Sequence, residues 1–208
     1  MPGAPAFKVQ DLVYVPCPES EDLPFLPATV HEIDGSEVVV QLADRSELQR
    51  FAAPELRRRF DTDRPTCQDN TSLVHLNDAT ILENLKARHQ VDDIYTYTAS
   101  VLLAVNPYKD VTGLYGASQC AKYRGKHIGA LAPHPYAIAD TAYRALVRDR
   151  KNQGFIISGE SGAGKTETAK IVMEYLGFVS GSTNQKTENR SRDACSKHSP
   201  FLNPSEMQ

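Results

Sequence analysis

Short runs of apolar and β-branched residues alternate with polar positions through the first part of the chain. Asp34-Gly35, a pair typical of tight hairpin turns, separates two of these runs. The runs cover residues 13–15, 28–33, 37–42 and 47–51. Closely spaced short strands of this kind predict a small antiparallel, β-barrel-like module over residues 1–56.

A polar segment separates this module from the rest of the chain. Residues 57–70 contain several aspartates and Pro65, a composition that predicts a linker to a larger unit over residues 71–181. The run Arg57-Arg58-Arg59 at the start of this segment fits either a solvated face or a basic contact patch. The run alone therefore identifies no partner.

Beyond the linker the apolar positions recur first at helical spacing and then in strand-like runs. Asn77 or Asp78 can cap a helix that ends around His89. A strand pair is expected next, over residues 94–98 and 99–105, because both runs are rich in β-branched and aromatic residues.

Two more helices are predicted in the second half of the chain. The first runs from Pro135 to about Lys151, and the second runs from Lys165 to about Phe178. The expected apolar stripes are Ile138, Ala142, Ala145 and Leu146 in the first helix, and Ile171, Val172, Tyr175, Leu176 and Val179 in the second. Before the second helix, residues 155–157 are wholly apolar, as expected for a strand covered on both faces.

The overall composition fits a globular protein and excludes several classes. Of 208 residues, 40% are hydrophobic and 24% are charged, which argues against wholesale disorder and against a fibrous architecture. The formal net charge of −3 provides no broad positive field, so nucleic acid is not an expected partner. After Ser180 the sequence is polar and aperiodic, and residues 182–208 are expected to form a disordered tail.

The cysteines and the hydropathy argue for a cytoplasmic location. The four cysteines lie far apart without a CxxC pair, which disfavours both a disulfide framework and a zinc site. No apolar stretch approaches the roughly 20 residues that a membrane helix requires, so membrane insertion is not expected. The N-terminus also lacks the pattern of a secretory signal.

One segment carries recognisable chemistry, because residues 159–166 match the pattern GxxxxGK[ST] between a predicted strand and a predicted helix. Its glycines let backbone N–H groups converge on phosphate oxygens, while Lys165 would reach the β and γ phosphates and Thr166 would ligate Mg²⁺. The predicted phosphate-binding residues are Gly159, Glu160, Ser161, Gly162, Ala163, Gly164, Lys165, Thr166 and Glu167. A glycine turn without a ligand is the alternative, which the matching lysine, threonine and flanking elements disfavour.

Hydrolysis requires more than a phosphate cradle, since a carboxylate must hold the metal shell and a further group must position water. None of the acidic residues after the loop follows a strand-like run. Glu160 and Glu167 fit supports of the loop better than general bases, and His134, between two prolines, fits a structural role. The sequence therefore predicts half of a catalytic site and no catalytic residue.

Taken together, these segments resemble the myosin motor head. The matching strings are Gly-Glu-Ser-Gly-Ala-Gly-Lys-Thr-Glu at 159–167, Leu-Asn-Asp at 76–78, Ile-Leu-Glu-Asn-Leu at 81–85, Ile-Tyr-Thr-Tyr-Thr at 94–98, Val-Asn-Pro-Tyr-Lys at 105–109 and Pro-His-Pro-Tyr-Ala-Ile-Ala-Asp at 133–140. The resemblance covers about residues 9–181 and implies an α/β fold. The implied architecture is a partial motor domain of the P-loop NTPase type, with a central β-sheet, after the barrel-like module.

The resemblance also implies an adenine pocket. In myosins an Asn-Pro-Tyr-Lys segment and a tyrosine shortly after it border the base. The corresponding residues here are Asn106, Pro107, Tyr108, Lys109 and Tyr115. From the residues alone, Asn-Pro after a strand is only a turn, and Tyr115 fits a core position equally well.

The function implied by the resemblance is that of an actin-based motor, an actin-activated ATPase of the cytoskeleton that uses ATP and Mg²⁺. Residues 189–192 do not reproduce the first switch loop of the family. This chain is therefore expected to be a truncated piece of a motor head without full motor activity, and its light chains cannot be predicted. The alternative is a non-motor nucleotide-binding or regulatory fragment. A small-molecule kinase is disfavoured because no arginine-bearing lid follows the loop helix.

Overall fold

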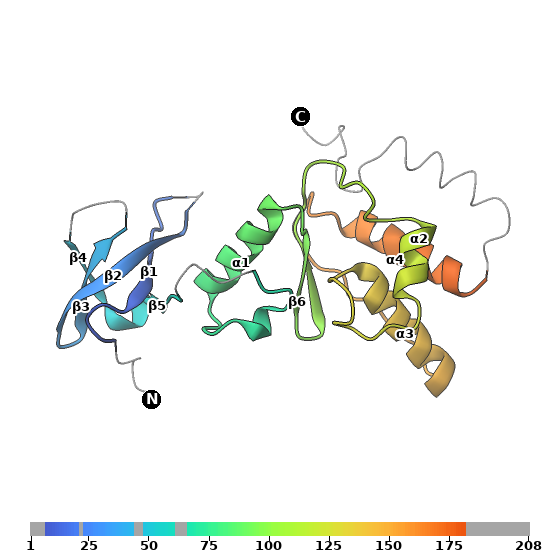
Figure 1. Cartoon of the computed structure of the whole chain (residues 1–208), viewed down its shortest axis with the longest axis horizontal. Coiled ribbons are helices and arrows are strands. Elements are labelled where there is room, and N and C mark those ends of the chain that lie inside the picture. The colour runs from blue at the N-terminus through green and yellow to red at the C-terminus, as the bar shows by residue number, and fades with distance from the viewer. Residues whose placement is uncertain (1–6, 21–22, 44–47, 61–65, 182–208) are drawn as a thin grey trace. The chain divides into compact units, whose positions relative to one another are not determined.

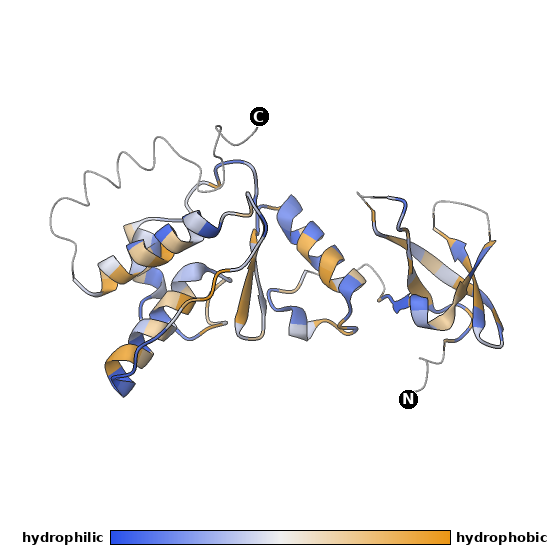
Figure 2. Ribbon diagram, turned by 180° about the vertical axis from the view of Figure 1, so that it is seen from behind, coloured by the Kyte–Doolittle hydropathy of each residue, from blue (hydrophilic) through white to orange (hydrophobic). Residues whose placement is uncertain are grey.

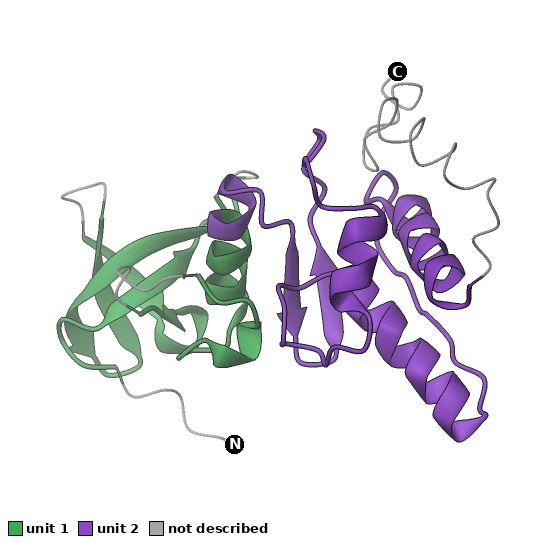
Figure 3. Cartoon of the chain, turned by 45° about the vertical axis from the view of Figure 1, so that its right-hand side comes forward, with its two compact units in different colours: residues 1–86 green, residues 87–208 purple. Residues whose placement is uncertain are grey.

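A computed structural model of the chain describes residues 7–20, 23–43, 48–60 and 66–181 (Figure 1). The chain divides into two compact units, Met1–Lys86 and Ala87–Gln208, drawn in green and purple in Figure 3. The predicted tail over residues 182–208, which includes Cys195, lies outside the described residues.

The first unit contains a five-stranded antiparallel sheet in the order β4-β3-β2-β1-β5. Its strands are β1 (Leu12–Pro16), β2 (Phe25–Asp34), β3 (Glu37–Leu42), β4 (Leu48–Ala52) and β5 (Arg57–Arg58), with a short 3₁₀ turn η1 (Ala53–Glu55) before the last. The four strands expected from the sequence are confirmed, and so is the hairpin, since Asp34 pairs with Glu37 across the turn at Gly35.

Alternation along the strands builds the core of the first unit. Successive side chains of a strand point to opposite faces, so Val13 and Val15 of β1 lie on the same face as Val38 and Val40 of β3. All four are at most 1% exposed. In the described residues the edge strands β4 and β5 do not pair with each other, so closure into a barrel stays a prediction.

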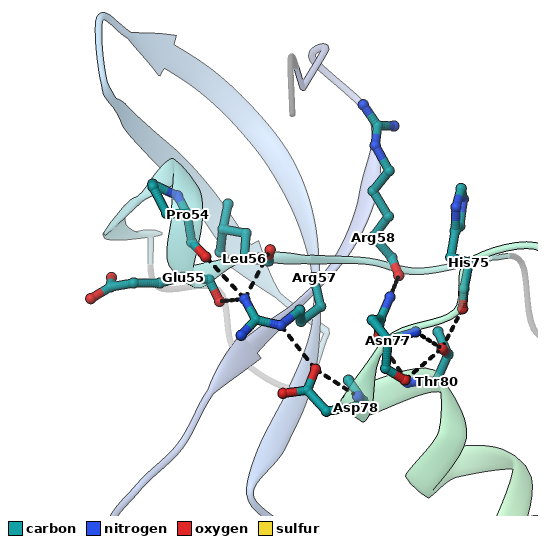
Figure 4. A network of polar contacts seen from close by, with 10 residues as sticks. Pro54, Glu55, Leu56, Arg57, Arg58, His75, Asn77, Asp78 and Thr80 are labelled. Carbon is teal, nitrogen blue, oxygen red and sulfur yellow. Dashed lines mark hydrogen bonds and ion pairs between the residues drawn. The ribbon is translucent and has the colours of Figure 1, made fainter. Parts of the chain in front are cut away.

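The arginine run at 57–59 is used inside the first unit. The Arg57 guanidinium donates to the Asp78 carboxylate at 2.8 Å and to the Pro54 carbonyl at 2.9 Å (Figure 4). Arg58 lies over the Phe7 ring, with 5.1 Å between its guanidinium carbon and the ring centroid. The run therefore makes contacts inside this unit. Arg57 and Arg58 form β5, so the segment expected to be a linker begins with two residues of the sheet.

Polar side chains fix the start of helix α1 (Asp78–Gln90). Asn77 accepts a hydrogen bond from the backbone N–H of Thr80 at 3.0 Å, which confirms the capping role expected at this position. The Asn77 amide also donates to the carbonyl oxygen of Arg58 at 3.0 Å (Figure 4). Together with the bond from Arg57 to Asp78, this contact ties the sheet to α1.

The compact unit therefore continues past the boundary expected near residue 70. A short 3₁₀ turn, η2 (Asn70–Ser72), lies near the start of the described segment that begins at residue 66. Within it Asn70 is fully buried and accepts a hydrogen bond from the Asn84 amide at 2.7 Å, which places η2 against α1. The division between the two units falls between Lys86 and Ala87, inside the same helix.

The described part of the second unit contains a hairpin and three helices after the end of α1. The elements are β6 (Tyr95–Thr98), β7 (Val101–Ala104), α2 (Ala117–Tyr123), α3 (Pro135–Asp149) and α4 (Lys165–Val179). The strand pair and the last two helices confirm the sequence predictions, whereas α2 was not predicted. β7 is hydrophobic along its whole length (Figure 2). None of the helices in the described ranges combines the length and the apolar character needed to span a lipid bilayer.

The strand expected over residues 155–157 is absent from the described fold. These residues pair with no other strand, and Ile156 is 98% exposed. A strand forms only when its backbone N–H and C=O groups pair with a neighbouring strand, and no described segment supplies such a partner here. Within the described ranges, the expected central β-sheet is therefore represented by the antiparallel β6–β7 pair alone.

The core of the second unit lies between α3 and α4. The expected face of α4 is confirmed, since Ile171, Val172, Tyr175 and Val179 are buried. The stripe expected on α3 is wrong in part. Leu146 is 41% exposed, whereas Tyr136, Ala139 and Asp140 are buried. Aromatic packing decides the face of α3, because the fully buried rings of Tyr136 and Tyr175 stack with their centroids 5.1 Å apart.

A buried carboxylate holds this core together. The Tyr175 hydroxyl donates to Asp140 Oδ1 at 2.8 Å, while Arg144 Nε and the Gly125 backbone N–H donate to Oδ2 at 2.7 and 3.1 Å. Asp140 is only 1% exposed, so these three donors supply the hydrogen bonds that a buried carboxylate requires. The carboxylate thereby connects α3, α4 and the loop between α2 and α3.

Candidate functional site

The loop before α4 owes its shape to its glycines. Gly162 and Gly164 have φ values of +74° and +91°, which residues with a Cβ atom rarely adopt. At Gly159 the reason is space, because an added Cβ would lie 3.1 Å from the Cβ of Ala163. The three glycines of the motif are thus explained by loop geometry.

The loop ends at a helix N-terminus that no side chain caps. Gly164 is the N-cap residue of α4, and no side-chain hydrogen bond caps this helix among the described residues. The first backbone N–H groups of a helix have no acceptor within the helix, and the aligned peptide dipoles give that end a partial positive charge. This end of α4 therefore suits an anion, phosphate in particular.

Lys165 adds a full positive charge at the same place. Its side-chain ammonium donates to the carbonyl oxygens of Gly159 and Glu160, both at 2.7 Å. These two bonds hold the ammonium against the loop, although the side chain remains exposed. Thr166 follows in the first turn and is also exposed, while the Glu167 carboxylate pairs with Lys170 one turn later. Glu167 therefore has an ion-pair partner on its own helix.

The turn after β7 lies beside this loop. The Asn106 amide donates to the carbonyl oxygen of Gly162 at 3.1 Å. Its Oδ1 accepts from the backbone N–H of Tyr108 at 2.8 Å, which fixes the turn that Pro107 begins. The structure thus brings Asn106, expected in the adenine pocket, into contact with the glycine loop that is expected to bind phosphate.

The other adenine-pocket candidates differ from one another in their exposure and in their contacts. Pro107 is buried, Tyr108 is 68% exposed, and the Lys109 ammonium lies 2.6 Å from the Asp92 carboxylate. Tyr115 lies in an aromatic cluster, where its hydroxyl is 2.7 Å from that of Tyr95. Burial raises the pKa of Tyr115 to about 12. A contact between Tyr115 and a base therefore stays a prediction.

His134 has the structural role expected of it. Its Nδ1 accepts a hydrogen bond from the Tyr136 backbone N–H at 3.1 Å and thereby caps α3, while Nε2 lies 3.0 Å from the Leu114 carbonyl oxygen. The side chain is 1% exposed, and this burial lowers its pKa to about 4. His134 is consequently neutral at physiological pH, with the proton on Nε2.

Sequence reasoning missed two residues that contact the turn at 106–109. His89 Nε2 lies 3.1 Å from the Asn106 carbonyl oxygen, and Asp92 pairs with Lys109. Both come from the end of α1 and the turn after it. No local motif marks them, because their partners lie some distance along the chain and the contacts depend on the fold.

The donor set decides what kind of metal fits. No group of three or more histidine, cysteine, aspartate or glutamate side chains that could hold a metal occurs in the described ranges. Near the loop, the Thr166 hydroxyl is the candidate ligand. Mg²⁺ commonly keeps several waters and binds through substrate phosphates and few protein oxygens, so the site fits a metal that arrives with a phosphate ligand.

Comparison with known proteins assigns the sequence to a family. A family model described as myosin head (motor domain) matches residues 67–204. The chain belongs to the myosin motor-domain family. The matched range runs past residue 181, where the resemblance by motif ends, and the domain limits proposed from sequence beyond residue 70 stay predictions.

Individual relatives support the assignment. The chain is 38% identical to Myosin-13 of Arabidopsis thaliana over 174 residues, which make up 84% of this chain and 12% of that protein. It is 41% identical to Myosin-15 of Arabidopsis thaliana over 166 residues, 78% of this chain and 11% of that one. Protein OPAQUE1 of Zea mays is 42% identical over 162 residues, 76% of this chain and 10% of the relative. The chain thus spans about a tenth of the length of these relatives.

Proposed function

We propose that this chain binds Mg-ATP through residues 159–167, as the nucleotide-binding part of a myosin motor. The observation that carries the proposal is the N-terminus of α4, which is capped by no side chain and follows a glycine loop against which the Lys165 ammonium is held. Membership of the myosin motor-domain family supports the same ligand.

Each part of the loop has a role in this proposal. The backbone N–H groups at the start of α4 bind phosphate oxygens, and Lys165 exchanges its two loop carbonyls for the β and γ phosphates. Thr166 binds the Mg²⁺ ion, which neutralises charge on the phosphates. Glu160, Ser161 and Ala163 contribute backbone to the loop.

We place the adenine base next to the turn at residues 106–109. Asn106, Pro107, Tyr108, Lys109 and Tyr115 border the adenine in this proposal. The hydrogen bond from Asn106 to Gly162 supports it, because this bond sets the turn beside the loop that holds the phosphates. The proposal includes a P-loop NTPase-type domain and barrel-like closure of the N-terminal sheet.

In a longer protein this site would serve an actin-based motor of the cytoskeleton, with actin filaments as the partner and ATP hydrolysis as the source of energy. The part of the chain described here contributes binding and does not itself hydrolyse ATP efficiently. Of the two glutamates at residues 159–167, Glu167 pairs with Lys170, and among the described contacts neither side chain has a second partner that could orient water. A non-motor, nucleotide-binding fragment would share this chemistry.

A titration with a fluorescent ATP analogue tests the proposal. We expect saturable binding that strengthens when Mg²⁺ is added, and loss of that metal dependence in Thr166→Ala. Thr168→Ala, in the same helix, is the matched control and should keep it. A single-turnover assay with radiolabelled ATP should detect little product. Binding that is indifferent to Mg²⁺ in the unmodified chain would argue against a Mg-nucleotide site.

A further inference from the structure

We propose that His89 and Asp92 are positioning residues of the nucleotide site, although neither belongs to the loops expected to touch the nucleotide. The inference rests on the proposed function and adds a second layer to the same site. His89 lies in the last turn of α1, and Asp92 lies in the turn that follows. Each contacts one end of the turn at residues 106–109.

The first contact leads to the phosphate-binding loop through two hydrogen bonds. His89 Nε2 lies 3.1 Å from the carbonyl oxygen of Asn106, within hydrogen-bond distance. The side-chain amide of the same Asn106 then donates to the carbonyl oxygen of Gly162 at 3.1 Å. His89 therefore fixes the backbone of the residue whose side chain holds the loop.

The second contact fixes the far end of the same turn. Asp92 Oδ1 lies 2.6 Å from the Lys109 ammonium, and both side chains are about half exposed. The backbone of Asp92 has a φ of +64°, a conformation that aspartate tolerates better than most residues. Its N–H donates to the His89 carbonyl at 3.1 Å, so the two positioning residues are also tied to each other.

The end of α1 is a firm support for these contacts. Arg88 is 3% exposed, and its guanidinium donates to the Tyr95 carbonyl at 3.0 Å and to the Thr96 hydroxyl at 2.9 Å. These bonds fasten the last turn of α1 to β6. A side chain that reaches out from a fixed element can hold a neighbouring turn in one geometry, and loss of that geometry lowers the affinity of a site.

Measurement of Mg-ATP binding by single-residue variants tests the first contact. His89→Ala should weaken binding about fivefold to tenfold, the effect of losing one hydrogen bond. His89→Gln, whose amide can donate to the same carbonyl, should recover at least half of that loss on a logarithmic scale. Gln90→Ala, at the neighbouring exposed position, is the control and should bind normally.

Combining the two substitutions tests whether His89 acts through Asn106. If His89 acts through Asn106, the double variant His89→Ala/Asn106→Ala should bind no more weakly than Asn106→Ala alone. Asp92→Asn keeps the tolerance for positive φ but removes the charge, and its effect should likewise disappear in the presence of Lys109→Ala. Fully additive losses, or a His89→Ala variant that binds like the unmodified chain, would overturn the proposal.

Amide hydrogen exchange separates this inference from the proposed function, because it requires no nucleotide. His89→Ala should speed exchange in the turn at 106–109 and in the loop at 159–164, at an unchanged midpoint of urea unfolding. If the unmodified chain binds no Mg-ATP but exchange still quickens in the variant, the positioning role stands and the proposed function fails. Unchanged exchange in both segments would contradict the positioning role.

Discussion

The amide of Asn106 donates to the carbonyl oxygen of Gly162 at 3.1 Å, although 56 positions separate the two residues in the chain. This bond joins the turn after β7 to the glycine loop before α4. It is the direct contact between the residues expected around the base and those expected around the phosphates. A hydrogen bond within the protein therefore links the part of the proposed site for the base to the part for the phosphates.

Replacing Asn106 by alanine should weaken the phosphate half of the site as well as the base half. The variant removes the hydrogen bond to Gly162, so we expect binding of both Mg-ATP and Mg-tripolyphosphate to weaken about fivefold to tenfold. Titration calorimetry with each ligand provides the measurement. A loss confined to Mg-ATP would show that Asn106 serves the base alone.

Gly164→Ala should destabilise the start of α4. A residue with a Cβ at a φ of +91° carries a cost of about 1–2 kcal/mol, and the substitution should lower the free energy of unfolding by that amount. Gly177→Ala lies inside the same helix, where the added Cβ would meet no atom within 4 Å apart from its chain neighbours and the backbone of the helix, and it should instead stabilise by about 0.5–1 kcal/mol. Urea unfolding monitored by circular dichroism distinguishes the two; equal effects would refute the backbone explanation.

Tyr175→Phe should destabilise the core through Asp140. The buried carboxylate loses the hydroxyl that donates to it at 2.8 Å, so we expect the free energy of unfolding to fall by about 1–3 kcal/mol. Tyr143→Phe removes the hydroxyl of a partly buried tyrosine outside this network and should change little. If Tyr175→Phe leaves the free energy of unfolding unchanged, the other two donors suffice for Asp140.

Acidification should destabilise the fold through His134. Burial lowers its pKa from 6.5 to about 4, so between these values the unfolded chain binds more protons than the folded one. The stabilising effect of the neutral ring is complete above about pH 6.5 and is lost as the pH falls towards 4, a difference of about 3 kcal/mol.

His134→Asn tests that assignment. The asparagine can still cap α3 through its carbonyl oxygen, but it does not titrate. The free energy of unfolding, measured from pH 7 down to pH 4, should therefore depend less steeply on pH than in the unmodified chain. An unaltered slope would assign the acid sensitivity to other groups.

Periodicity predicted the parts of the fold that local sequence controls. The buried face of α4 follows from the spacing of Ile171, Val172 and Tyr175, and the shape of the glycine loop follows from residue types that tolerate positive φ. Asn77 was one of the two residues expected to cap α1, and its side chain does cap the helix that begins at the next residue. Each of these features depends on neighbours close in the chain.

The features that sequence missed depend on distant partners. The apolar run at 155–157 has strand-like residues, but pairing requires a neighbour that no described segment provides. On α3, Asp140 is buried because Tyr175 and Gly125 donate to it, which an apolar pattern cannot anticipate. His89 entered the candidate site only through its contact with Asn106, and no motif marks that position.

Calorimetric titration of Mg-ATP into the chain and into Lys165→Ala tests the central claim most directly. Lys122→Ala, which removes an exposed positive charge from α2, is the control. We predict binding to the unmodified chain and to Lys122→Ala, and a loss of at least tenfold in affinity for Lys165→Ala. Equal binding by Lys165→Ala, or no binding by unmodified chain that is folded and soluble, would contradict a nucleotide site at this loop.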